Sequence, residues 1–118
     1  MASLKSRQVG SITILMPKGY LTGGEETEEL EKAIKQQSDE NNKHLVINLS
    51  ETQHLNSTAL GVLISAHSNY VRRGGQMKLA AVDKRIENIF VITKLSLVFD
   101  VYPTEEQAIA SFAERESV

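Results

Sequence analysis

The sequence predicts an α/β domain in which strands and helices alternate and the later strands pair largely in parallel. Short apolar runs of strand length recur along the 118 residues, and segments with apolar residues three or four positions apart lie between them. Glycines and polar turn residues separate the two kinds of segment. Alternation of this kind indicates helices packed on a sheet with parallel pairing. The length suits one domain, so we expect residues 1–118 to form a single unit.

The N-terminal third is expected to contain a strand followed by a helix. Residues 9–16 mix β-branched side chains with alternation, which is typical of a strand, and residues 20–21 are candidates to extend it. Glycines at 23 and 24 precede a helix predicted over residues 25–37. Leu30 and Ile34 lie on its apolar face, and glutamates in its first turn favour the positive end of the helix dipole.

The middle of the chain predicts a second strand and a second helix. Residues 44–49 form an apolar run of strand length, which indicates a strand covered on both faces. Residues 50–56 are expected to be a turn-rich connection, and residues 57–71 a helix that glycines 74 and 75 terminate. Five side chains at helical spacing predict its buried face: Leu60, Leu63, Ile64, His67 and Val71.

The C-terminal third predicts a strand, a short helix, a last strand and a final helix. Residues 77–82 and 98–102 are the expected strands, and the final helix begins near residue 104. The short helix between the strands carries more apolar side chains than one buried face needs, because Val91 and Ile92 follow its buried stripe. We expect the C-terminal helix to cover them; a contact surface is the alternative.

Composition excludes several classes of function. A net charge of −2 and an aromatic content of 5% offer neither a basic surface nor a stacking platform for nucleic acid. The absence of cysteine removes disulfides, thiolate metal sites and cysteine nucleophiles, and the three histidines lack metal-ligand spacing. No nucleotide-binding or serine-hydrolase motif is present. We therefore expect a protein that is not an enzyme and needs no cofactor or metal.

The location is expected to be cytoplasmic. The N-terminal residues lack the apolar core of a signal peptide, and no apolar stretch approaches the roughly 20 residues that cross a bilayer. No membrane partner is therefore expected.

The most informative segment is the start of the second helix, residues 55–61. Asn56 is a good N-cap, which places Ser57 at the first helical position and Thr58 beside it. Unpaired amides and the helix dipole favour a phosphate at such a place. Serine and threonine there are also ordinary capping residues, and the local chemistry alone favours that simpler interpretation.

Three motifs together resemble the STAS family of anti-sigma-factor antagonists over nearly the whole chain. The family motif Asp-Ser-[Ser/Thr]-[Gly/Ala]-Leu-Gly is matched by residues 56–61, Asn-Ser-Thr-Ala-Leu-Gly. Gly19 and Leu21 match a Gly-x-Leu pair before the first helix, and residues 74–75 match a Gly-Gly pair after the second. Asn56 and Thr22 stand where the family usually has aspartate.

The resemblance implies a fold and a function. The fold would be a STAS-like single domain, a mixed and mostly parallel sheet of about five strands with about four helices mainly on one face. The unphosphorylated protein would bind an anti-sigma factor with serine kinase activity. Phosphorylation of Ser57, with Thr58 as the secondary candidate, would abolish that binding, and a serine phosphatase would restore it. The chain would be a monomer or weak dimer. The partner surface would comprise Asn56, Ser57, Thr58, Gly61 and Ser65.

A rival interpretation remains open because Asn56 removes the usual negative charge beside Ser57. The chain would then be a STAS scaffold or transporter-associated subunit that uses the same surface without being phosphorylated.

Overall fold

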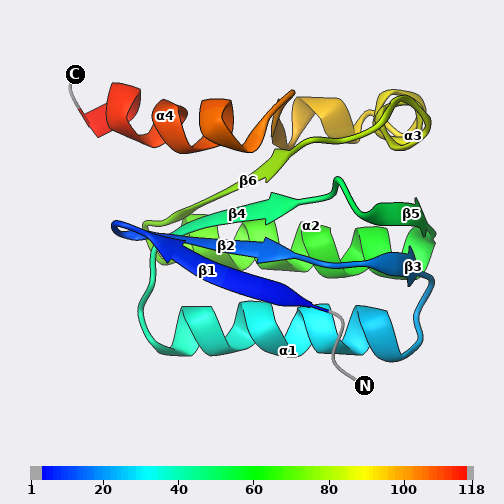
Figure 1. Ribbon diagram of the computed structural model, residues 1–118, viewed down its shortest axis with the longest axis horizontal. Coiled ribbons are helices and arrows are strands. Elements are labelled where there is room, and N and C mark those ends of the chain that lie inside the picture. Colours follow the sequence, from blue (N-terminus) through cyan, green and yellow to red (C-terminus); the bar gives the residue numbers. More distant parts are fainter. Residues whose placement is uncertain (1–3, 117–118) are drawn as a thin grey trace.

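The computed structural model describes residues 4–116, with side chains as far as Ala113, and its centre is a five-stranded mixed sheet (Figure 1). The strand order is β1-β2-β4-β6-β7, and a separate two-stranded sheet joins β3 to β5. The strands are β1 (Lys5–Val9), β2 (Ile12–Met16), β3 (Gly19–Leu21), β4 (His44–Asn48), β5 (Thr52–Leu55), β6 (Gln76–Ala80) and β7 (Asp100–Tyr102). The helices are α1 (Glu25–Asp39), α2 (Ser57–Arg72), α3 (Lys84–Ile92) and α4 (Glu105–Glu116), with a 3-10 turn at Leu95–Leu97. The α/β class and the mixed, mostly parallel sheet are confirmed.

The order of the strands determines which face each helix covers. β2, β4, β6 and β7 are parallel neighbours in chain order, and α1, α2 and α3 connect them one after another. Connections between parallel strands keep one hand, so successive crossovers in one direction bring these helices to the same face. α4 follows β7 and packs against the opposite face, where Ala108 and Phe112 contact Ile12, Ile14 and Val46 in a second core cluster.

The central strands are apolar on both sides because both faces of the sheet are covered. In β4, Leu45 and Ile47 point into the larger core beneath α1, α2 and α3, whereas Val46 between them points toward α4. All three side chains are fully buried. The apolar run therefore has the character of a central parallel strand, as the sequence predicted.

Residues 9–16 do not form one strand, contrary to the prediction. The chain turns at Gly10 and Ser11, and β1 pairs with β2 as an antiparallel hairpin in which Val9 lies opposite Ile12. Gly10 has φ of 60°, a left-handed conformation that glycine adopts without the steric cost a Cβ imposes. Gly10 and Ser11, predicted as the interior of a strand, therefore form the turn of the hairpin.

The predicted connection over residues 50–56 contains a strand, β5, that pairs in parallel with β3. Thr52 and Leu55 are buried, whereas the two residues between them are exposed. This pattern does not alternate, which is why periodicity did not reveal the strand. The pairing brings the segment that precedes α2 against the segment that precedes α1.

The buried face of α2 differs from the predicted one. Leu60 and Leu63 are buried as expected, but Ile64 is 37% exposed and Val71 55%. The remaining buried residues are Ala59, Ala66 and Tyr70. All three belong to the larger core cluster, so the buried face of α2 is set by its packing against that core and not by hydrophobicity alone.

α4 does not cover Val91 and Ile92, contrary to the prediction. These side chains are 58% and 80% exposed on α3, whereas Ile86 and Phe90 of the same helix are buried in the larger core. α4 lies on the other face of the sheet and packs chiefly against β4, β6 and β7.

Polar contacts attach α4 to the sheet. The Glu105 carboxylate forms an ion pair with Arg7 of β1 and accepts a 2.9 Å hydrogen bond from the Asn48 side-chain amide of β4. Further along the helix, the fully buried Lys78 ammonium donates a 2.6 Å hydrogen bond to the Ser111 hydroxyl and lies 4.5 Å from the Phe112 ring centroid. The cation is thus held between a hydroxyl and an aromatic face.

Glu105→Gln should lower stability in a pH-dependent way. The hydrogen bond from Arg7, aided by that from Asn48, lowers the pKa of Glu105 below its usual value. A carboxyl with a lowered pKa stabilises the fold fully above its unfolded pKa of about 4.3, and the stabilisation is lost as the pH falls through the folded value. Glu105→Gln should cost about 1 kcal/mol at pH 7 and progressively less below about pH 4. Urea unfolding of both proteins from pH 7 to below about pH 4 measures the difference in the free energy of unfolding.

The neighbouring variant Glu106→Gln is the matched control, since Glu106 is exposed in the same helical turn. A Glu105→Gln deficit that stays constant from neutral to acidic pH would contradict the assignment.

Candidate functional site

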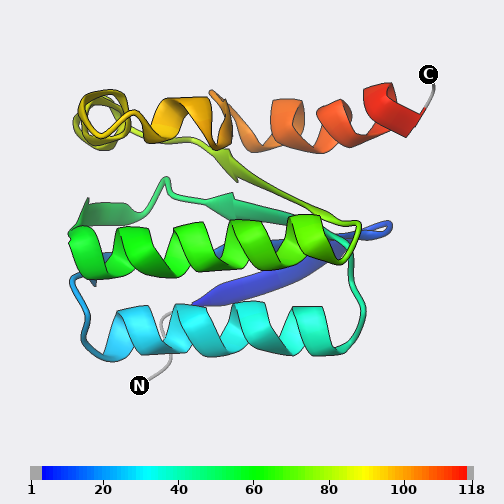
Figure 2. The same cartoon turned by 180° about the vertical axis from the view of Figure 1, so that it is seen from behind.

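The candidate site is the N-terminal end of α2, at the carboxyl edge of the parallel strands. β4 ends at Asn48, β5 follows, and α2 begins at Ser57 directly after β5. Figure 2 shows α1 and α2 side by side with their N-terminal ends at the same end of the molecule. The two helix starts thus lie beside each other.

Asn56 caps α2 and joins it to the segment before α1. Its side-chain oxygen accepts hydrogen bonds from the backbone N–H groups of Thr58 at 3.1 Å and Ala59 at 3.2 Å. Its side-chain amide donates to the Thr22 carbonyl at 3.0 Å, and its backbone N–H donates to the Leu21 carbonyl at 3.1 Å. The predicted N-cap is confirmed. An asparagine suits this position because the same side chain both accepts and donates; a carboxylate would lack the donor for Thr22.

Ser57 and Thr58 are exposed at the first two positions of the helix, and Asn56 is half-buried beneath them. Among the side chains of residues 4–113 and the backbone of residues 4–116, neither hydroxyl has a hydrogen-bond partner. The first turn of α2 contains no acidic residue, whereas acids occupy the first turns of α1, α3 and α4. The Ser57 hydroxyl is therefore accessible, and its own helix presents no side-chain negative charge against an added anion.

Gly61 and Ser65 continue the exposed surface of α2, four and eight residues after Ser57. A Cβ added to Gly61 would meet no atom within 4 Å, so nothing inside the protein requires a glycine there. Ser65 lines a shallow groove of about 310 Å³ between α1 and α2. The five predicted site residues thus extend from the N-cap of α2 to the ninth residue of the helix.

Three residues outside the predicted set flank the start of α2: Gly23, Tyr20 and His54. Gly23 packs against Thr58, since a Cβ at Gly23 would lie 3.3 Å from the Thr58 methyl, and its φ is 97°. Its backbone N–H donates a 2.9 Å hydrogen bond to the Thr27 hydroxyl. Tyr20 of β3 is 58% exposed, with its ring 6.2 Å from that of the exposed His54 on β5. Two features of the sequence pointed to these residues: Tyr20 lies within the Gly-x-Leu pair, and His54 lies two residues before Asn56.

The described residues offer neither a metal site nor a membrane-spanning helix beside the start of α2. Among the described residues no cluster of three or more histidine and acidic side chains has the geometry to hold a metal ion. The His67 ring packs edge-on against the Phe99 ring, with 5.5 Å between the ring centroids, so it faces the interior and not the exposed surface of α2. No helix in the described range has both the length and the apolar character that crossing a membrane requires.

Solved structures share this fold. A putative anti-sigma factor antagonist from Thermotoga maritima is 21% identical, with a TM-score of 0.85 and 92% of each chain covered. The phosphorylated form of the Bacillus cell fate determinant SpoIIAA is 15% identical, with a TM-score of 0.74 over 93% of this chain and 99% of that one. A sulfate transporter family protein from Wolinella succinogenes is 14% identical, with a TM-score of 0.76 over 93% and 91%. At these identities the likeness shows the fold alone.

Most of the chain matches one protein family. The model of the STAS domain matches residues 3–108, which includes every strand, the first three helices and the start of α4. The predicted resemblance is confirmed, and the chain belongs to the STAS domain family.

Proposed function

We propose that this protein is an anti-sigma factor antagonist whose unphosphorylated form binds an anti-sigma factor kinase and whose binding is abolished by phosphorylation of Ser57. The observation that carries the proposal is the exposed, unbonded Ser57 hydroxyl at a capped helix N-terminus. The likeness to anti-sigma factor antagonists, one of them solved in a phosphorylated form, supports it. The role is regulatory and non-enzymatic, and it operates in the cytoplasm of a bacterium, where a serine phosphatase resets the switch.

The switch works because the fold and the partner respond differently to the same group. A phosphate adds about −1.5 to −2 charges and three acceptor oxygens. At the end of α2 it meets the positive end of the helix dipole and no acidic side chain in the first turn, so the fold accommodates it. A partner packed against a neutral hydroxyl must instead desolvate the dianion or move away.

The loss of binding free energy that a phosphate can cause is large enough for a switch. A loss of about 3 kcal/mol in binding free energy weakens the complex by more than about a hundredfold. No rearrangement of the domain is required, since the change is confined to the surface where the partner lies.

One observation supports a second function. Asn56 donates to the Thr22 carbonyl, so an amide fits this position without the negative charge that usually stands beside the phosphoacceptor. A STAS scaffold or transporter-associated subunit that uses the α2 surface without phosphorylation is compatible with this, and a transporter family protein shares the fold. Incubation with the cognate kinase and ATP, followed by intact-mass measurement, separates the two: one added phosphate on Ser57 favours the antagonist, and none favours the scaffold.

Ser57→Ala should bind the kinase normally and accept no phosphate, whereas Ser57→Asp should fold normally and bind at least about tenfold more weakly, since its charge is smaller than that of a phosphate. Calorimetric titration against the kinase gives the affinities. Ser68→Ala, an exposed serine further along α2, is the matched control. Binding of Ser57→Asp as tight as that of the parent chain would refute the charge mechanism.

Gly61→Ala should separate stability from binding. An alanine in a helix is about 0.5–1 kcal/mol more stable than glycine, and the open space around Gly61 accommodates its methyl group. If the partner approaches the backbone there, the same methyl group should weaken binding about tenfold while the melting temperature rises. Higher stability with unchanged affinity would remove Gly61 from the partner surface.

Asn56→Asp should accelerate phosphorylation of Ser57 by the cognate kinase if a neighbouring carboxylate orients the hydroxyl. The carboxylate still accepts from the Thr58 and Ala59 amides, so the cap survives, but the hydrogen bond to Thr22 is lost. We expect stability within about 1 kcal/mol of the parent. Phosphate incorporation over time is the measurement, and equal rates would show that the charge is dispensable.

A further inference from the structure

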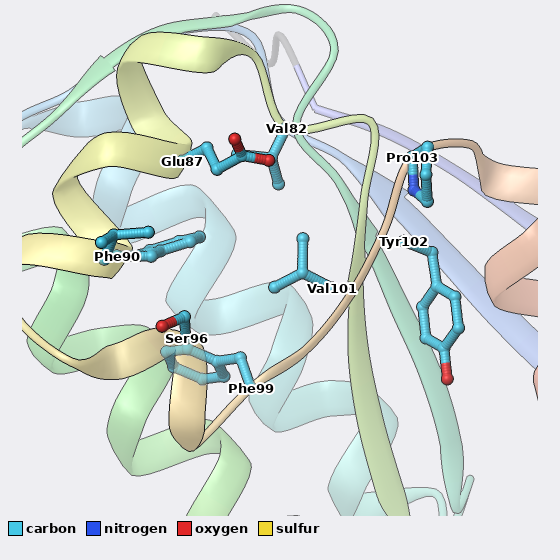
Figure 3. Close-up of a pocket in the computed structure, with 9 residues that line it drawn as sticks. Val82, Glu87, Phe90, Ser96, Phe99, Val101, Tyr102 and Pro103 are labelled. Carbon is cyan, nitrogen blue, oxygen red and sulfur yellow. The ribbon is translucent and has the colours of Figure 1, made fainter.

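A second surface feature, between α3 and β7, shares no residue with the Ser57 site. It is an open cavity of about 450 Å³ (Figure 3). The rings of Phe90 and Phe99, 5.7 Å apart, close its inner end, and Val101 of β7 lies across from them. Small ligand sites in proteins have volumes of about 300–1,000 Å³, so this cavity has room for a small molecule.

The topology of the sheet explains why a cavity forms here. β6 and β7 are adjacent parallel strands, but the chain leaves β6 for α3 on one face and leaves β7 for α4 on the other. Val82, directly after β6, and Pro103, directly after β7, both line the cavity. In open α/β sheets, ligands bind in the crevice at the carboxyl ends of neighbouring strands whose connections diverge to opposite faces.

The lining restricts the chemistry of a ligand. Valines and phenylalanines make up most of the walls, together with Tyr102 and Pro103, and Glu87 is the only acidic side chain of the lining. Its carboxylate points into the cavity toward Val82 (Figure 3) and forms no ion pair or hydrogen bond within the described part of the chain. The Ser96 hydroxyl adds one neutral polar group at the rim. Among the side chains that line the cavity, an anion would meet the Glu87 carboxylate and no cation, whereas an ammonium group would pair with Glu87.

We propose that this cavity binds a small molecule with an apolar, ring-sized body and one cationic nitrogen: the body contacts Phe90, Phe99 and Val101, and the nitrogen pairs with Glu87. Phosphates, nucleotides and carboxylates do not fit this charge pattern. The site is independent of Ser57, so it gives the domain an input for a small molecule that is separate from phosphorylation.

Three probes with the same ring and different charge test the proposal: tryptamine (cation), tryptophol (neutral) and indole-3-acetate (anion). Each is titrated into ¹⁵N-labelled protein up to about 10 mM, since an occupant of this size binds weakly. We expect saturable amide shifts at Val82, in the segment 87–91 and at Val101, with tryptamine binding most tightly and indole-3-acetate most weakly. Glu87→Gln should weaken tryptamine binding about fivefold and leave tryptophol unchanged, because only an exposed ion pair is lost.

Two further variants complete the design. Ser96→Phe places a ring at an exposed position of the rim and should abolish binding of all three probes; Glu106→Gln removes an exposed acid elsewhere and should change nothing. A thermal melt of each variant confirms that it is folded. Absence of saturable shifts, shifts at another site, indole-3-acetate binding as tightly as tryptamine, or unaltered tryptamine affinity in Glu87→Gln would overturn the proposal. None of these outcomes bears on Ser57.

Discussion

The constraint on which this structure depends is the parallel pairing of β2, β4, β6 and β7 in chain order. Because each strand runs in the same direction, every helix that follows one begins at the same edge of the sheet. The amino ends of the helices, with their free N–H groups and positive dipoles, therefore gather at that edge. Both surface features of interest lie there: the start of α2 with Ser57, and the crevice at the carboxyl ends of β6 and β7.

At the start of α2, one side chain sets the geometry. Asn56 satisfies two amides of the helix and holds the Thr22 carbonyl, and β3 pairs with β5 immediately before it. These contacts fix the backbone on both sides of Ser57 while its hydroxyl remains exposed. A rigid backbone beneath an accessible hydroxyl suits a site that a modifying enzyme must reach and a partner must recognise, because neither event requires the domain to reorganise.

The sequence predicted the elements that carry a clear pattern of apolar residues. The four helices were predicted from apolar spacing that matches one period over many residues, and the buried strand before residue 50 from its continuous apolar run. The hairpin at Gly10 and the short strand β5 were missed because pairing with a neighbouring strand, and not a pattern along the chain, identifies them.

The candidate site was more predictable than the surface around it. Asn56 as cap and Ser57 as first helical residue follow from local chemistry, and the structure confirms both positions. The exposure of Ile64 and Val71 was not predictable, because burial on α2 depends on how it packs against α1 and the sheet, which helical periodicity does not specify. The hydrogen bond from Asn56 to Thr22 joins residues 34 positions apart, so no local sequence pattern predicts it. The same holds for the cavity, because its lining residues Val82 and Pro103 follow two different strands.

The central claim is that a phosphate on Ser57 is tolerated by its own fold and rejected by the partner. The most direct measurement compares unmodified protein with protein carrying phosphoserine incorporated at position 57 during synthesis, in both urea unfolding and titration against the anti-sigma factor kinase. The account predicts free energies of unfolding within about 1 kcal/mol of each other and a Kd raised by more than about a hundredfold. Equal Kd values, or a phosphorylated form that binds weakly only because it is unfolded, would contradict it.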